Sequence, residues 1–260
     1  MTRIITVTNQ KGGVGKTTTA STLICGLHHR GARVLGVDVD PQGNLGFSLG
    51  LDGEGMPTLY DVFTGTHPIQ DTIVHTRYGD VIPADIMLSG VDVSFTAPQR
   101  EFMLTKFLDT IKTFYDFIII DTPPSLNLLT INAYVASTEL IIPMEAEVLS
   151  LVGISQILDT INTVRASFNP GLKVLGILMN KYDSRTRLCR EMLDLAKDIA
   201  GQMNSRVFPV HVHRGTDVAR APAHGQSILS YKPGSKPARD LEAFVSIIAG
   251  DQFPPVNTPY

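Results

Sequence analysis

The feature that most restricts how this chain can fold is a glycine-rich loop, QKGGVGKTT, at residues 10–18. A short β-branched run, Arg3–Thr8, precedes this loop, and a run of helical character, Lys16–Arg30, follows it. Glycines allow backbone N–H groups to approach phosphate oxygens closely, and a helix N-terminus attracts anions. The loop therefore predicts a phosphate-binding site between a strand and a helix, which requires an α/β fold.

The remainder of the chain alternates between strand-like and helical runs, at the spacing of βαβ units. Asp116–Ile120 (DFIII) is typical of a strand buried on both faces of a parallel sheet. We therefore predict a single-domain α/β fold of the P-loop NTPase type over residues 1–250, with a mainly parallel twisted sheet, helices on both faces and a frayed tail at 251–260. Further strands are expected at Arg33–Val39, Glu139–Pro143, Leu172–Met179 and Arg206–Val210, and further helices at Ala97–Phe114, Leu126–Ala136, Ser150–Phe168, Arg185–Met203 and Lys236–Ala249.

Composition argues against several other classes of protein. The chain has 260 residues, of which 43% are hydrophobic, and a chain of this kind can bury the core of one α/β domain. No apolar run approaches the roughly 18–20 residues of a membrane span. The two cysteines, Cys25 and Cys189, are far apart and lack metal-ligand spacing, which indicates reduced thiols in a cytoplasmic protein.

Individual residues of the loop predict individual contacts with a nucleotide. Lys16 would supply a positive charge to the β- and γ-phosphates, and the Thr17 hydroxyl would be a ligand of Mg²⁺. Gln10 stands where the G-x-x-x-x-G-K-[ST] pattern has its first glycine, so the loop is a variant that carries a second lysine, Lys11. The residues expected to cradle the phosphates are Gly12, Gly13, Val14, Gly15, Lys16, Thr17 and Thr18.

This variant loop resembles that of the ParA/MinD family of deviant Walker ATPases. In that family the first lysine, here Lys11, reaches across a dimer interface to the partner's nucleotide. Residues 38–44 (DVDPQGN) resemble a second family motif, in which Asp40 orients the attacking water, and residues 120–124 (IDTPP) resemble a third, in which Asp121 holds Mg²⁺ through water. The resemblance implies ATP and Mg²⁺ as cofactors, with Lys11, Lys16 and Asp40 as catalytic residues and with Thr17, Asp40 and Asp121 at the metal.

The resemblance extends over nearly the whole chain and is closest to small, Soj-like ParA proteins. Residues 57–62 (PTLYDV) and 221–226 (APAHGQ) resemble segments of those proteins. There are also departures. Glu145 replaces a common Gln, although Glu147 still matches, and Lys236-Pro237 replaces the more usual Arg-Gly. The resemblance therefore leaves the role of Glu145 open.

The residues that would recognise the base allow two interpretations. Asn180–Asp183 spells N-K-x-D, the guanine-reading motif of GTPases, in which the aspartate accepts hydrogen bonds from guanine. Relatives with this phosphate loop usually place an asparagine here against adenine, and backbone near a residue such as Pro209 completes the pocket. We favour ATP, with Asn180 and Pro209 at the base and Asp183 as a turn or capping residue, and GTP is the alternative.

Charge is unevenly distributed along the chain. Residues 181–239 contain 11 Lys/Arg against 5 Asp/Glu, although the net charge of the whole chain is −3. A basic segment on an acidic chain suggests a surface for a polyanion, and without a recognition-helix pattern we expect binding to DNA phosphates that is independent of sequence. The expected DNA-binding residues are Arg185, Arg187, Arg214, Arg220, Lys232 and Lys236, with Arg206 and Arg239 as further candidates.

Together these features predict a ParA-type partition ATPase. We expect an ATP-dependent homodimer that binds double-stranded DNA non-specifically and segregates or positions a plasmid, chromosome or other cargo. Because no arginine finger is evident, a ParB-like or other adaptor protein is expected to stimulate slow hydrolysis. The expected location is cytoplasmic and nucleoid-associated. Membrane binding is not expected, because an amphipathic membrane-binding helix at the C-terminus would need basic residues and no Lys or Arg follows Arg239. The alternative is a MinD-like or metabolic cargo-positioning ATPase that does not bind DNA.

Overall fold

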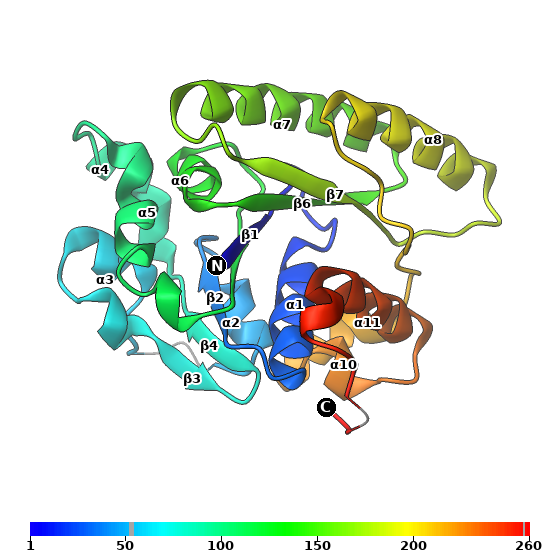
Figure 1. Ribbon diagram of the computed structural model, residues 1–260, viewed down its shortest axis with the longest axis horizontal. Helices are drawn as coiled ribbons and strands as arrows, with labels where there is room; N and C mark the ends of the chain where they lie inside the picture. The colour runs from blue at the N-terminus through cyan, green and yellow to red at the C-terminus, as the bar shows by residue number, and fades with distance from the viewer. Residues whose placement is uncertain (52–54, 257) are drawn as a thin grey trace.

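In the residues that the computed structural model describes, 1–51, 55–256 and 258–260, seven strands form a single sheet (Figure 1). The strand order is β3-β4-β2-β5-β1-β6-β7, and all neighbouring strands are parallel except β3 and β4. The strands are β1 (Arg3–Val7), β2 (Val34–Asp38), β3 (Val74–Thr76), β4 (Gly79–Ile82), β5 (Phe117–Asp121), β6 (Glu139–Glu145) and β7 (Lys173–Asn180).

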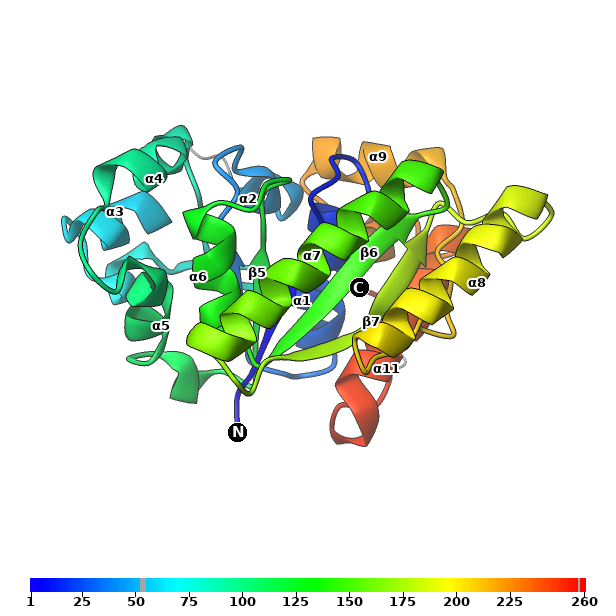
Figure 2. The same cartoon turned by 90° about the horizontal axis from the view of Figure 1, so that it is seen from above.

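Helices cover both faces of the sheet (Figures 1 and 2). One face carries α1 (Lys16–His29), α2 (Asn44–Ser48), α9 (Thr216–Arg220), α10 (Ile228–Tyr231) and α11 (Lys236–Ala249). The other carries α3 (Leu59–Thr64), α4 (Val91–Ser94), α5 (Met103–Leu108), α6 (Leu128–Ala136), α7 (Val148–Ser167) and α8 (Arg187–Gln202). Short 3₁₀ segments are η1 (Ile69–Thr72), η2 (Ile86–Gly90), η3 (Arg100–Phe102), η4 (Lys112–Phe114), η5 (Ala221–His224) and η6 (Gly250–Gln252).

The central strand β5 shows why both faces must be covered. Phe117 and Ile119 pack into the core on the α1 side, whereas Ile118 and Ile120 pack into the core on the α5 and α6 side. Successive side chains of a strand point to opposite faces, so a strand that is apolar at every position needs cover on both. The predicted α/β fold, with a mainly parallel sheet between two helical layers, is therefore confirmed.

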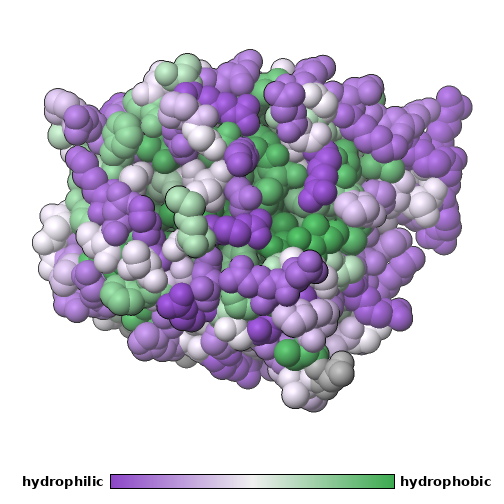
Figure 3. Space-filling view, in the orientation of Figure 1, coloured by the Kyte–Doolittle hydropathy of each residue, from purple (hydrophilic) through white to green (hydrophobic). Residues whose placement is uncertain are grey.

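The outer surface is more polar than these layers. In Figure 3 hydrophilic residues predominate over α8 at the right margin, while hydrophobic residues gather toward the middle of the face shown. Within the described part of the chain, no helix is both long enough and apolar enough to cross a lipid bilayer.

The predicted helix over Ala97–Phe114 is wrong, because three short segments replace it: η3, α5 and η4. Gln99, just before η3, has a left-handed backbone with φ of 64°, which prevents a helix from passing through it. After α5, the Thr110 hydroxyl donates to the Phe107 carbonyl at 2.7 Å. Such local side-chain bonds compete with helix continuation, and Thr110 is followed by β-branched Ile111.

The predicted strand over Arg206–Val210 is also wrong, since only Val207 in this segment forms a bridge, to Ile177 of β7, among the described residues. Pro209 has no backbone N–H to donate to a ladder. The hairpin of β3 and β4 was not predicted, because its strands are too short for a clear alternating pattern.

The C-terminal residues that we expected to fray make defined contacts in the structure. The Phe253 ring lies 5.6 Å from the Phe117 ring in an edge-on arrangement, and the Tyr260 ring stacks on His29 at 4.1 Å. The Tyr260 hydroxyl donates to the Glu242 carboxylate on α11. These contacts place the tail against α1, α11 and the start of β5.

The packing of α1 against α11 makes a prediction about stability. A side chain at Gly26 of α1 would meet the Val245 side chain of α11 at 2.7 Å, whereas one at Gly201 of α8 would meet nothing within 4 Å. Gly26→Val should therefore lower the free energy of unfolding by about 1–3 kcal/mol through overpacking. The matched control, Gly201→Val, should stay within about 0.5 kcal/mol of the original protein. Urea titrations followed by circular dichroism would compare them, and equal effects of the two changes would contradict this packing.

Candidate nucleotide-binding site

The predicted site residues converge at the carboxyl edge of the sheet, where five parallel strands end. The glycine-rich loop follows β1, and Asp38 and Asp121 end β2 and β5 in directly paired positions. Glu145 ends β6 opposite Asn180, which ends β7. In Figure 2 the dark-blue loop between β1 and α1 lies at the upper edge of the sheet beside α9. Ligands of open α/β sheets bind at this edge, because the loops after the strands meet there.

The glycine-rich loop has a backbone that only glycine adopts readily at two positions. Gly13 and Gly15 have φ of 76° and 92°, in the left-handed region. A side chain at Gly15 would also lie 2.6 Å from the Asn180 amide nitrogen, which itself donates to the Val14 carbonyl at 2.7 Å. The end of β7 thus packs directly on the loop, and this close approach explains the need for glycine there.

Lys16 folds back over this loop. Its Nζ donates to the Lys11 carbonyl at 3.1 Å, and only 7% of the residue is exposed. Burial lowers the pKa of Lys16, and the carboxylates of Asp121 and Asp40 oppose this shift. The structure thus brings the predicted phosphate lysine together with both predicted metal-site carboxylates.

Asp121 is the clearest sign that the site takes a further group. Its side chain is fully buried, yet neither carboxylate oxygen has a hydrogen-bond partner among the described residues. Burial raises the pKa of Asp121, and the neighbouring Thr17 hydroxyl and Lys16 ammonium oppose this shift. Buried polar atoms without partners are rare. Oxygen donors from Asp121 and Thr17 suit Mg²⁺ with its retained water ligands.

The two aspartates of the DVDPQGN segment have different surroundings. The Asp38 carboxylate accepts from the backbone N–H groups of Asp40 at 3.0 Å and Leu45 at 2.9 Å, so it holds the turn that carries Asp40. The Asp40 carboxylate accepts from the Gln42 N–H at 3.1 Å. Sequence reasoning assigned no role to Asp38, although a second acid two residues before Asp40 was a visible signal. The role of Asp40 in orienting water stays a prediction.

Lys11 makes a different contact from Lys16. Its Nζ forms an ion pair with Glu147, just after β6, and the lysine side chain is 28% exposed. The Lys11 pair lowers the pKa of Glu147. Within one protomer, therefore, the second lysine is held at the protein surface by a carboxylate, and its predicted cross-interface contact is untested.

A cavity of about 520 Å³ adjoins the loop and provides the space for a base. It is lined by Gly13–Gly15 of the loop, by Asn180 and Lys181 after β7, and by residues of the segment 212–219. The predicted Pro209 is exposed and is not among the lining residues. The segment runs alongside β7, pairing Val207 with Ile177 and His213 with Tyr182, so Pro209 lies beside the middle of the strand and only Val212 onward reaches its carboxyl end.

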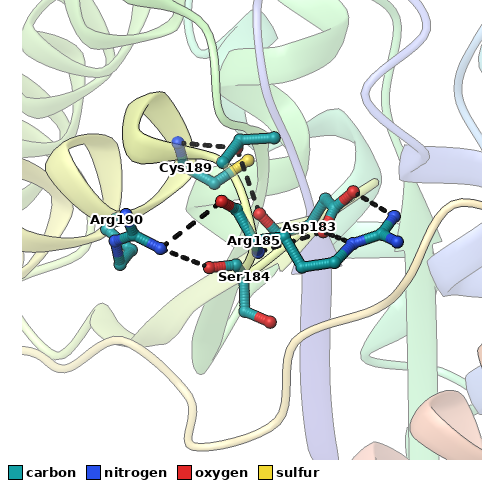
Figure 4. A network of polar contacts seen from close by, with 6 residues as sticks. Asp183, Ser184, Arg185, Cys189 and Arg190 are labelled. Atoms are coloured by element: carbon teal, nitrogen blue, oxygen red, sulfur yellow. Dashed lines mark hydrogen bonds and ion pairs between the residues drawn. The ribbon is translucent and has the colours of Figure 1, made fainter.

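The structure weakens the GTPase interpretation of N-K-x-D. Both Asp183 carboxylate oxygens accept from the Arg185 guanidinium, at 2.9 and 2.7 Å (Figure 4). This pair holds the pKa of Asp183 well below its usual range. The carboxylate that would read guanine is thus engaged within its own turn. Asn180, by contrast, is buried beside the cavity, and its carbonyl oxygen has no partner among the described residues, which suits an amino group such as that of adenine.

The six predicted DNA-binding residues fall into separate groups. Arg185 pairs with Asp183, Arg187 with Glu191 and Lys232 with Asp217. Arg214 is exposed but lines the nucleotide cavity, which the sequence did not indicate. Arg220 and Lys236 are exposed and form no ion pair with a described carboxylate. The basic segment therefore presents fewer unpaired charges than its composition suggests.

Comparison with known proteins agrees with this site. A family model described as an AAA domain matches residues 2–174. The chromosome partitioning protein ParA of Caulobacter vibrioides is 40% identical over 88% of this chain and 87% of its own length. The sporulation initiation inhibitor protein Soj of Bacillus subtilis is 39% identical over 92% of this chain and 94% of its own.

A solved structure from Mycobacterium smegmatis, described as cobyrinic acid a,c-diamide synthase with a bound ATP analogue and magnesium, has a TM-score of 0.84. It is 35% identical, and the match covers 100% of both chains. The fold and the site thus define a P-loop nucleoside triphosphatase. More narrowly, the chain belongs to the ParA/Soj family of deviant Walker ATPases, as the sequence resemblance predicted. Bound ATP analogue and magnesium in that relative agree with ATP and Mg²⁺ as the predicted cofactors.

The position of Thr17 beside Asp121 predicts a magnesium-dependent effect. Thr17→Ala should remove the increase in ATP affinity that Mg²⁺ produces, a loss of about tenfold for one charge-assisted contact. Thr22→Ala is the matched control, because this buried hydroxyl lies on the same helix and has no hydrogen-bond partner within residues 1–51, 55–256 and 258–260. The dissociation constant of ATP would be measured with Mg²⁺ and with EDTA. A full magnesium effect in Thr17→Ala would exclude this residue from the metal site.

Proposed function

We propose that this protein is a ParA-type partition ATPase, which hydrolyses ATP with Mg²⁺ and uses the nucleotide to control dimerisation. The observation that carries the proposal is the fully buried Asp121 at the end of a central strand, near Lys16 and Thr17, whose carboxylate oxygens have no hydrogen-bond partner in the described part of the chain. A buried carboxylate in these surroundings suits a divalent cation, which would in turn be a ligand of the phosphates. The names of the relatives support the partition role.

The proposed roles in hydrolysis follow from the positions of the side chains. The backbone N–H groups of Gly12 to Thr18 bind the phosphates, and Lys16 stabilises charge on the β- and γ-phosphates. Thr17 and Asp121 hold Mg²⁺, which supplies electrostatic stabilisation to the phosphates when bound. Asp40, on the turn held by Asp38, orients the attacking water. Asn180 accepts from the adenine amino group, with the segment from Val212 to Thr216 closing the pocket in place of Pro209.

The second lysine supports an ATP-dependent homodimer. Lys16 already folds over the loop, and the partly exposed Lys11 is held by Glu147. In the proposed dimer Lys11 leaves Glu147 and contacts the phosphates bound by the partner subunit. Exposed ion pairs contribute at most about 1 kcal/mol to stability. Breaking the Lys11–Glu147 pair so that Lys11 can contact a triphosphate therefore costs little.

DNA binding is proposed for the dimer, through the exposed cations of each subunit. Arg220 ends α9 and Lys236 begins α11, two elements that lie close together, since a side chain at Gly215 would lie 2.7 Å from Pro237. We call the surface around Arg220 and Lys236 the basic patch. Two basic patches on one dimer would bind the same duplex together and increase avidity by a factor on the order of 10²–10⁴. A ParB-like or other adaptor would stimulate hydrolysis, and the protein would be cytoplasmic and nucleoid-associated.

Two substitutions separate dimerisation from hydrolysis. Lys11→Ala should bind ATP but stay monomeric, because the cross-interface contact is lost. Asp40→Ala should bind ATP and dimerise but hydrolyse it at least about 100-fold more slowly, since its carboxylate acts in the transition state. Light scattering and phosphate release would be measured on both, with the exposed Lys106→Ala of α5 as control. ATP-dependent dimers of Lys11→Ala, or a normal rate in Asp40→Ala, would refute the corresponding role.

Lys236, the residue of the basic patch that begins α11, allows a specific test of DNA binding. Lys236→Glu should weaken ATP-dependent DNA binding by about tenfold and reduce the salt dependence by about one phosphate contact per subunit. The fold should tolerate this change, because an acidic residue in the first turn of a helix is favourable. Lys106→Glu, an equal charge change on the opposite face of the sheet, is the control. Equal losses in both variants would show a general charge effect, and no loss in either would favour the alternative ATPase that does not bind DNA.

A further inference from the structure

An ion pair between the ends of β6 and β7 lies against the phosphate loop. The Lys181 ammonium is 2.6 Å from the Glu145 carboxylate and also donates to the Gly13 carbonyl at 2.9 Å. The Glu145 side chain is only 10% exposed. A carboxylate so deeply buried requires a charged or hydrogen-bonding partner. Lys181 satisfies that requirement and at the same time contacts the loop.

The backbone of Lys181 is itself unusual. Its φ of 51° places it in the left-handed region, which is unfavourable for a residue with a side chain. Such a conformation persists only where the surroundings determine it. Here it allows two consecutive side chains at the end of β7 to reach the same loop: Asn180 donates to the Val14 carbonyl at 2.7 Å, and Lys181 to the Gly13 carbonyl.

Holding these two carbonyls has a consequence for phosphate binding. In a planar trans peptide the carbonyl of one residue and the N–H of the next point in opposite directions. Fixing the Gly13 and Val14 carbonyls toward β7 therefore directs the N–H groups of Val14 and Gly15 to the other side, into the loop. Those N–H groups are donors that a phosphate loop offers to its ligand. Gly13 has no side chain and would otherwise sample several orientations.

We propose that Lys181, braced by Glu145, is a positioning residue that holds the Gly13–Val14 peptide in the phosphate-binding orientation before the nucleotide arrives. The inference rests on the proposed function, because it concerns the same nucleotide site. Lys181 also lines the cavity proposed for the base, but its ammonium is bonded to the loop backbone and to Glu145, so its main contribution belongs to the phosphates. Glu145 acts only through Lys181, by keeping the ammonium beside the loop.

The test compares ligands with and without phosphates. Lys181→Met keeps the length and the apolar stem of the side chain but removes the donor, and should weaken ADP binding by about tenfold, the effect of one charge-assisted hydrogen bond. Adenosine affinity should change less than about twofold, because adenosine lacks the phosphates that the loop N–H groups bind. Lys181→Arg retains N–H donors and should restore most of the ADP affinity. Calorimetry would measure ADP, and displacement of a fluorescent ADP analogue would measure adenosine.

Glu145→Gln tests whether Glu145 acts through Lys181. It should weaken ADP binding in the original protein but have no further effect when Lys181 is already replaced by Met. Thermal unfolding without nucleotide should be similar for Glu145→Gln and the double variant. Unchanged ADP affinity in Lys181→Met, equal losses for ADP and adenosine, or additive effects of the two substitutions would each overturn the positioning role. If the unsubstituted protein bound no ADP, the proposed function itself would fail, which distinguishes the two failures.

Discussion

The site depends on one cluster of buried charge at the carboxyl ends of the central strands. Lys16 is almost fully buried beside Asp121 and Asp40, and Asp121 is paired in register with Asp38. A buried charge costs several kcal/mol unless other charges or hydrogen bonds compensate it. Asp38 accepts hydrogen bonds from two backbone N–H groups, whereas the Asp121 oxygens have no hydrogen-bond partner among the described residues, and the Lys16 ammonium is the charge that opposes their burial. The strand order brings these groups together, because β1 and β2 both flank β5.

Around this cluster, the phosphate loop is held from outside by acidic residues. Glu145, the last residue of β6, pairs with Lys181, and Glu147, two residues later, pairs with Lys11. We interpret the two pairs differently. Lys181 contacts the loop backbone and is proposed to orient it, whereas Lys11 belongs to the loop and would leave its pair in the proposed dimer to reach a partner subunit. In this interpretation Glu145 keeps Lys181 against the loop, whereas Glu147 holds Lys11 only until the dimer forms.

In the basic segment, residues 181–239, ion pairs with nearby acids reduce the number of positive charges that are available to DNA. The excess of Lys and Arg between residues 181 and 239 predicted a broad cationic surface. In the structure Arg185 and Arg187 are paired with acids two and four residues away, and Lys232 with Asp217. Exposed ion pairs of this kind are weak and can exchange for DNA phosphates, but the unpaired Arg220 and Lys236 are the stronger candidates. The proposed DNA surface is accordingly smaller than the one expected from counting charges.

The sequence by itself determined the α/β class and the chemistry of the phosphate loop, because both depend on local patterns: the apolar run of β5, the glycines before Lys16 and the acids that end strands. Only the tertiary structure decided which distant residues meet this loop. The residues from Val212 to Thr216, which include Arg214, line the cavity where the sequence had predicted Pro209. Lys181 pairs with Glu145 beside the loop. These contacts follow from the register between β6, β7 and the segment beside them, which depends on packing across the sheet and leaves no signature in neighbouring residues.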